Sequence, residues 1–193
     1  ELGRTFMHNI MMFLEFQLPI NISLLILSVI YPMIVTGALL ASVQILIVNI
    51  IMDSLNSLSF GGEPPKDEYM TEKPIKKGSG LFIRGAKKRI AISTVAFIVL
   101  YGIITFSPIS DMFATETEAI TARFALLCFM AVFNGFNIRT EHINLFNGIG
   151  KNKLFSAIAI GIFVMTIALC SFAENLIKVT ALDFKHWVVV VIL

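Results

Sequence analysis

Long apolar runs separated by short polar stretches dominate this chain. Five runs are long enough to cross a bilayer, because a transmembrane helix needs about 20 predominantly apolar residues. The five predicted spans cover approximately residues 10–33, 38–60, 90–107, 119–138 and 154–173, and a sixth begins at 184 and is cut at 193. The pattern therefore predicts an all-α fold, a polytopic bundle of membrane helices in which residues 1–193 form one domain.

The composition agrees with this pattern. Hydrophobic residues make up 56% of the 193 residues and charged residues 15%, and the mean hydropathy is +0.84. A soluble domain carries about 25% charged residues, so we expect the lipid bilayer to surround this chain. The net charge of +2 gives no indication of a nucleic-acid partner. Because the chain starts at Glu1 and ends within an apolar run, we expect it to be a piece of a larger protein.

The predicted orientation follows from where the Lys and Arg residues lie. Basic residues near the ends of spans stay on the cytoplasmic side of the membrane. The stretch 61–89 contains eight of them and the stretch 139–153 contains three, whereas the stretch 108–118 has three acidic residues and no base. We therefore expect 61–89 and 139–153 to be cytoplasmic loops and the N-terminus to be cytoplasmic.

The second predicted span contains an amide and a carboxylate, Asn49 and Asp53, inside an apolar run. On an α-helix the spacing of four places both on one face, and Asn56 follows on the same stripe. An ionisable group at membrane depth is costly and indicates a functional site. No Lys or Arg is expected at comparable depth in any span, which disfavours a structural ion pair for Asp53. Oxygens in this arrangement can replace the water around a cation, and this indicates ion transport.

The first predicted span has Pro19 in its interior and Asn21 two residues later. Pro19 cannot donate the helical hydrogen bond to the carbonyl of Glu15, and carbonyls exposed in broken helices form ion sites in many transporters. We therefore predict that Asn21 is a ligand through its amide oxygen, with an interhelical hydrogen bond as the alternative. Since Ca²⁺ takes roughly six to eight oxygens, the remaining ligands must be backbone, water or a part of the protein that is missing here.

Polar residues near the predicted cytoplasmic ends of the spans have simpler interpretations. Glu15 is predicted to be solvated, with a place on the access path of the ion as the alternative. Asn134 and Asn137 stand where the fourth span ends. Helix capping and interfacial hydrogen bonds explain them, and a ligand role is the alternative.

The chemistry of other sites is not indicated. Cys128 and Cys170 lie in apolar runs and are predicted to be small buried hydrophobic residues. No ligand spacing for zinc connects the three histidines, which are His8, His142 and His186. The chain contains no phosphate-binding loop, no Ser/His/Asp arrangement and no nucleotide motif, so we expect no hydrolysis by this chain alone.

Several segments resemble the C-terminal transmembrane half of the P-type ATPases. The resemblance is to the plasma-membrane (calmodulin-regulated) type of calcium pump and runs from the fifth span to the start of the tenth. The segments that carry it are EFQLPIN at 15–21, QILIVNIIMD at 44–53, EPP at 63–65, KPI at 73–75, FNGFNIR at 133–139, and NGI at 147–149 followed by Asn152.

The resemblance implies that Asn21, Asn49 and Asp53 are Ca²⁺ ligands. Relatives that bind two calcium ions have acids at the positions of Leu24 and Ala131, so a single ion per cycle is implied. Gly135 stands where this branch usually has a glutamate. The implied partners are the bilayer and the remainder of the same pump, its upstream spans and cytoplasmic domains.

The implied parent protein is an ATP-driven enzyme. Its phosphorylation and nucleotide domains, which would bind ATP and Mg²⁺, are not in this chain. A plasma membrane or an intracellular membrane is implied for its location. Two alternatives stay open at this point: a pump for Mn²⁺ or another cation, since hard oxygen ligands also accept Mn²⁺, and a stand-alone scaffold or regulatory remnant that does not transport.

Overall fold

A computed structural model describes residues 2–35, 37, 39–61, 85–139, 153–172 and 177–193. Helices joined by turns and short irregular segments make up these residues, with no strand among them, which confirms the all-α prediction. The helices in chain order are α1 (Leu2–Ile34), α2 (Ser42–Ile47), the π-helix η1 (Val48–Met52), α3 (Asp53–Gly61), α5 (Ala86–Phe106), the 3₁₀-helix η2 (Pro108–Met112), α6 (Glu116–Arg139), α7 (Lys153–Phe172) and α9 (Phe184–Ile192).

Four helices in the described part of the chain are long and apolar enough to cross a membrane. They occupy Gly3–Ile34, Ala86–Phe106, Glu116–Ile138 and Lys153–Phe172. The predicted span 38–60 is divided among α2, η1 and α3, and it stays a predicted crossing. Most of the predicted loops 61–89 and 139–153 lies outside the described residues.

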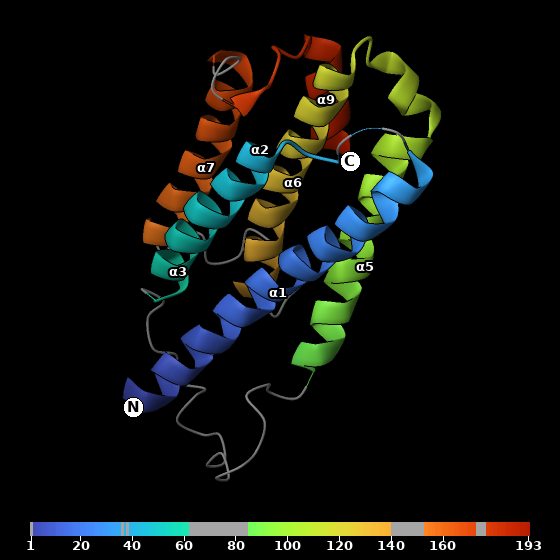
Figure 1. Ribbon diagram of the computed structural model, residues 1–193. Coiled ribbons are helices and arrows are strands. Elements are labelled where there is room, and N and C mark those ends of the chain that lie inside the picture. Colours follow the sequence, from blue (N-terminus) through green and yellow to red (C-terminus); the bar gives the residue numbers. More distant parts are fainter. Residues whose placement is uncertain (1, 36, 38, 62–84, 140–152, 173–176) are drawn as a thin grey trace.

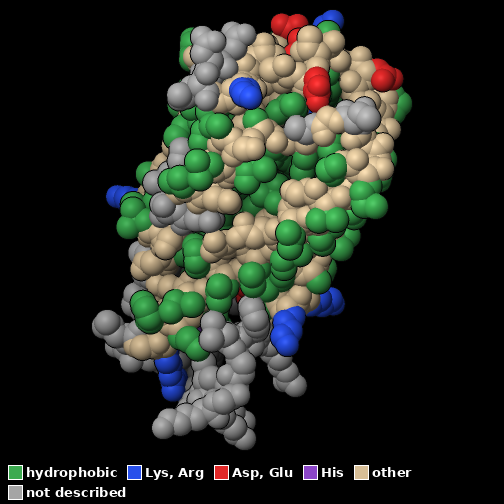
Figure 2. Space-filling view, in the orientation of Figure 1, with side chains coloured by type: hydrophobic (Ala, Val, Ile, Leu, Met, Phe, Trp, Pro, Cys, Tyr) green, Lys and Arg blue, Asp and Glu red, His purple; other side chains and the backbone are tan. Residues whose placement is uncertain are grey.

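The helices form one bundle (Figure 1). The α1 helix lies diagonally across it and packs against α5, α3 and α6, while α7 packs against α6 and α3 and α9 against α6. The α6 helix is the central one, because 72% of its apolar window is buried inside the bundle, against 28% for α5 and for α7. Apolar side chains cover the sides of the molecule, and acidic side chains gather at its upper end (Figure 2).

Local sequence signals explain where the central spans begin and end. Pro108 follows α5 and cannot continue it, since proline lacks the donor for the next helical bond, and the Ser107 hydroxyl accepts from the backbone of Ile109. At the start of α6 the Thr115 hydroxyl accepts from the Glu118 backbone, and the Glu118 carboxylate accepts from the backbone N–H of Ala114 at 2.7 Å. The first bond satisfies an amide that the first turn of a helix leaves unpaired, and the second fixes the backbone just before the helix.

Candidate ion-binding site

The segment that carries Asn49 is a π-helix and not an α-helix. Asn49 lies in η1, and Asp53 is the first residue of α3 directly after it. The prediction that the two residues are related by one α-helical turn is therefore wrong, because π turns use i→i+5 hydrogen bonds and contain more residues. Single π turns inside helices are frequent at functional sites. Asn49 is exposed on this chain, and the side chains of residues 51–56 are outside the described part.

Asn21 is half-buried on α1, half a turn after the buried Pro19. The α1 helix continues through both Pro19 and Pro32, so the expected broken helix is not present, although the Glu15 carbonyl still has no donor at residue 19. The helix packs against α3, the element that begins at Asp53. The structure thus brings together the elements that carry two of the predicted ligands.

The two positions where two-ion relatives have acids are apolar and buried here. Leu24 is 7% exposed and Ala131 fully buried, and both belong to the hydrophobic core of the bundle. Among the described residues no group of three or more His, Cys, Asp or Glu is placed to hold a metal ion. Amide and carbonyl oxygens are therefore the main donors that this part of the chain can offer.

Glu15 is not solvated, and that prediction is wrong. Its side chain is 5% exposed and forms a bidentate ion pair with Arg89 at the start of α5. The Arg89 Nη2 and Nε atoms donate to the two carboxylate oxygens at 2.6 and 2.7 Å. Charge-assisted fork contacts of this kind are among the strongest side-chain hydrogen bonds. The pair joins α1 to α5, 74 residues apart in the sequence.

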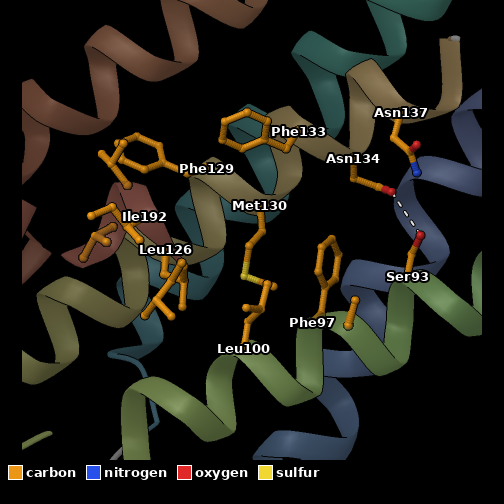
Figure 3. Close-up of a pocket in the computed structure, with 14 residues that line it drawn as sticks. Ser93, Phe97, Leu100, Leu126, Phe129, Met130, Phe133, Asn134, Asn137 and Ile192 are labelled. Atoms are coloured by element: carbon orange, nitrogen blue, oxygen red, sulfur yellow. Dashed lines mark hydrogen bonds between the residues drawn. The ribbon is translucent and has the colours of Figure 1, made fainter. Parts of the chain in front are cut away.

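Asn134 connects three helices and does not cap one, since α6 continues to Arg139. Its Oδ1 accepts from the Ser93 hydroxyl at 3.2 Å, and its Nδ2 donates to the Phe16 carbonyl at 3.4 Å. Figure 3 shows the Ser93 contact at one end of a cavity of about 420 Å³ between α5, α6 and α9, which Asn137 also lines. The capping interpretation was wrong for Asn134, and the hydrogen bonds run between helices.

Gly135 lies against an aromatic cluster. A Cβ atom there would be 3.3 Å from the Phe155 ring and 3.7 Å from the Phe16 ring. Phe155 also packs edge-on against Phe136 and tilted against Phe60. Phenyl rings therefore line the space next to residue 135, and a side chain there, such as the glutamate usual in the resembled branch, would require the Phe155 ring to shift.

Arg123 is a buried charge that the sequence analysis missed. It is 5% exposed on α6, and its Nη1 donates to the Tyr31 hydroxyl at 2.7 Å and to the Leu39 carbonyl at 3.2 Å. A base thus lies near the start of the predicted span 119–138, and the expectation that none lies at the depth of Asp53 stays a prediction. The signal was available, because Arg123 is the only Lys or Arg in the predicted span 119–138.

Gln44 is a second residue whose role only the structure shows. It is fully buried, and its Nε2 donates to the carbonyls of Ile177 and Lys178. Its Oε1 accepts from the backbone of Ala41 before α2. The side chain therefore fixes the start of α2 to the segment that precedes α9.

The remaining residues considered for metal chemistry have structural surroundings. Cys128 and Cys170 are free and buried, as predicted. His186 is buried, with Nε2 3.0 Å from the Met112 carbonyl and its ring against Phe113. His142 lies outside the described residues.

Comparisons with known proteins agree with the resemblance. Residues 37–193 match the family described as "Cation transporting ATPase, C-terminus". The chain is 30% identical to "Probable calcium-transporting ATPase 9, plasma membrane-type" of Oryza sativa subsp. japonica over 190 residues, 96% of this chain and 18% of that protein. It is 28% identical to "Plasma membrane calcium-transporting ATPase mca-1" of Caenorhabditis elegans over 203 residues, 99% of this chain and 16% of that protein.

A third relative matches the chain with a similar identity and coverage. "Calcium-transporting ATPase 10, plasma membrane-type" of Arabidopsis thaliana is 30% identical over 193 residues, 97% of this chain and 18% of that protein. The chain spans less than a fifth of the length of these curated relatives. With a family match over most of its residues and a bundle of membrane-length helices, the chain belongs to the cation-transporting ATPase C-terminal family.

Proposed function

We propose that this chain is the membrane part of a P-type calcium pump and contributes ligands to one intramembrane Ca²⁺ site, from which calcium is exported from the cytosol. The observation that carries the proposal is the π turn η1, which holds Asn49 and leads directly into Asp53 in an apolar segment. A helix defect beside a carboxylate at membrane depth is costly unless it serves a function. The relatives are named calcium-transporting ATPases, which favours Ca²⁺ as the ion.

The proposed ligands are Asn21, Asn49 and Asp53. Asn49 is exposed on this chain, so its amide has an open side toward ligands from other spans. Three side chains supply only part of the roughly six to eight oxygens that Ca²⁺ takes. Backbone carbonyls, water and upstream spans of the pump complete the shell. ATP and Mg²⁺ bind in its cytoplasmic domains.

The α1 helix is suited to transmit motion to this site. Its 33 residues extend about 50 Å at 1.5 Å per residue, whereas the hydrocarbon core of a bilayer is about 30 Å thick. The excess of about 20 Å, roughly three to four turns, extends beyond the membrane at one end as a stalk. Phosphorylation of a cytoplasmic domain then tilts α1 and exposes the site first to one side and then to the other.

ATP-driven calcium uptake tests the proposal and its stoichiometry. Vesicles containing the full-length pump are expected to accumulate ⁴⁵Ca²⁺ with one ion transported per ATP, because Leu24 and Ala131 provide no second set of acids. Parallel measurement of ATP hydrolysis gives the ratio. A ratio of two contradicts the one-site proposal, and uptake of Mn²⁺ in preference to Ca²⁺ under the same conditions contradicts the choice of ion.

We also propose that the N-terminus and the loop 61–89 are cytoplasmic. The N-terminal end of α1 and the start of α5, with Lys87, Lys88 and Arg89, lie at the same end of the bundle (Figure 1). The positive-inside rule assigns that end to the cytoplasm. A cysteine at Ser79, which is outside the described residues, is therefore expected to react with an impermeant maleimide only from the cytoplasmic side. Labelling of intact cells from outside contradicts this orientation.

The stand-alone scaffold remains the alternative function. An Asp-Lys-Thr-Gly-Thr motif upstream in the same reading frame supports the pump, since that segment carries the aspartate that is phosphorylated in the resembled family. Its absence from the reading frame supports the scaffold.

A further inference from the structure

The side chain of Arg123 contacts the end of α1 and the connection that follows it. Its Nη1 bonds to the Tyr31 hydroxyl and the Leu39 carbonyl, and its guanidinium carbon lies 5.1 Å from the centre of the Tyr31 ring. Tyr31 is in the last turn of α1, and Leu39 is in the connection between α1 and α2. Arg123 therefore joins α6 to the connection between α1, which carries Asn21, and α2, which leads directly into η1 with Asn49.

The two residues that Arg123 binds lie between the proposed ligands Asn21 and Asn49 in the sequence. Tyr31 follows Asn21 by ten residues, and Leu39 precedes Asn49 by ten. On α1 this spacing corresponds to about 15 Å at 1.5 Å per residue. The same guanidinium thus binds Tyr31 on one side of the connection and Leu39 on the other. Each of these residues is equally far in sequence from its nearer amide, Asn21 or Asn49.

Further hydrogen bonds make this end of the bundle a connected unit. The Tyr101 hydroxyl of α5 donates to the Arg123 carbonyl at 2.9 Å. The Thr121 hydroxyl, half a turn earlier on α6, accepts from the backbone of Thr180 at 3.1 Å. Together with the contacts of Gln44, these bonds fasten α2, α5, α6 and the segment before α9 to one another.

The free-energy cost of burying the Arg123 guanidinium indicates a role beyond filling space. A charged side chain within a membrane span costs several kcal/mol unless it is paired and hydrogen-bonded. The guanidinium presents its donors in fixed directions, whereas a lysine ammonium sits on a flexible stem. Arg123 Nε donates to the Ala119 carbonyl on its own helix, which orients the group, and Nη1 holds a phenol and a backbone carbonyl from two separate segments.

We propose that Arg123 is a positioning residue that clamps the α1–α2 connection to α6 and so makes this end of the bundle the fixed end about which α1 tilts. Alternating access needs one part of the site to stay in place while another moves. The clamp sets the relative position of Asn21 and Asn49 without touching the ion. This inference rests on the proposed function, because it assigns Arg123 to the same calcium site.

The test uses the full-length pump with R123Q, R123K and, as a control, Lys153→Gln. Lys153 is an exposed base at the start of α7, so its loss removes the same charge without the contacts. R123Q is expected to raise the calcium concentration for half-maximal ATPase activity about tenfold, the size of one lost charge-assisted hydrogen bond. R123K is expected to lie between R123Q and wild type, and K153Q to match wild type.

The maximal ATPase rate per folded pump distinguishes a positioning role of Arg123 from a role in folding. The amount of folded pump is measured from the monodisperse peak in size-exclusion chromatography. Positioning predicts a changed half-maximal calcium concentration with a preserved maximal rate. A smaller folded fraction with unchanged calcium dependence shows a merely structural role and overturns the proposal.

Amide hydrogen exchange over residues 31–45 provides a readout that needs no ion. R123Q is expected to exchange faster there than wild type and K153Q, and unchanged exchange overturns the clamp. Calcium-independent ATPase activity in the wild type instead contradicts the proposed function, and the exchange result still decides whether the clamp exists.

Discussion

Replacing Asp53 with asparagine in the full-length pump is expected to abolish calcium-dependent phosphorylation by ATP. Among the three proposed ligands Asp53 is the only one with a charge. Hard cations such as Ca²⁺ bind tightly where carboxylates offset the loss of hydration, and a charge acts strongly in the low dielectric of the membrane interior. The apparent calcium affinity is therefore expected to fall by more than about 100-fold, since several kcal/mol of attraction are lost.

The measurement is phosphoenzyme formation from γ-³²P-labelled ATP over a calcium titration. Asp183→Asn serves as the matched control, because Asp183 is an exposed carboxylate before α9 whose side chain forms no capping hydrogen bond. That variant is expected to titrate like the wild type. Wild-type calcium affinity in Asp53→Asn would remove Asp53 from the ligand set.

Breaking the ion pair between Glu15 and Arg89 is expected to have the second largest effect. Replacing Arg89 with glutamine leaves the Glu15 carboxylate, which is 5% exposed, without its bidentate partner. Removing one member of a buried pair costs about 3–5 kcal/mol. The Arg89 side chain is 55% exposed, so water screens part of the interaction, and we expect a loss of about 1–3 kcal/mol in the free energy of unfolding.

Glu15→Gln is expected to cost less than Arg89→Gln, since a glutamine oxygen can still accept from the Arg89 guanidinium. The double variant is expected to cost less than the sum of the two single variants, because residues in direct contact are not additive. Thermal unfolding of the detergent-solubilised pump measures all three. Lys88→Gln, an exposed base next to Arg89, is the control and is expected to stay within about 0.5 kcal/mol of wild type. Strict additivity would show that the contact contributes nothing.

The predictions that succeeded depend on properties that are local in the sequence. Apolar runs of membrane length and the low content of charge were enough for the all-α bundle, because the bilayer forces backbone groups to be satisfied within a helix. The buried positions of Cys128 and Cys170 follow from the same runs. The predicted ligands Asn21, Asn49 and Asp53 stay a prediction, and the structure places the first two on α1 and η1.

Two failed predictions, the α-helical turn from Asn49 to Asp53 and the break at Pro19, concern local backbone geometry, whereas the others concern partners that are distant in the sequence. Glu15 near the end of a span was expected in water, and Arg89 from the following polar stretch covers it. Arg123 was overlooked because one charge barely changes the hydropathy of a long apolar run, yet its partners Tyr31 and Leu39 lie 92 and 84 residues away. Such pairs form only after the helices have packed.

By itself, the sequence determined that this chain forms membrane helices and that a few amides and two carboxylates, Glu15 and Asp53, interrupt them. Both conclusions come from the transfer free energy of each residue, which depends little on its neighbours in space. Only the tertiary structure decided that Asn49 stands in a π turn and that Arg123 and Gln44 fasten the connection and the start of α2. Buried polar contacts between helices are determined by the packing of distant parts of the chain, and the order of residues alone does not reveal that packing.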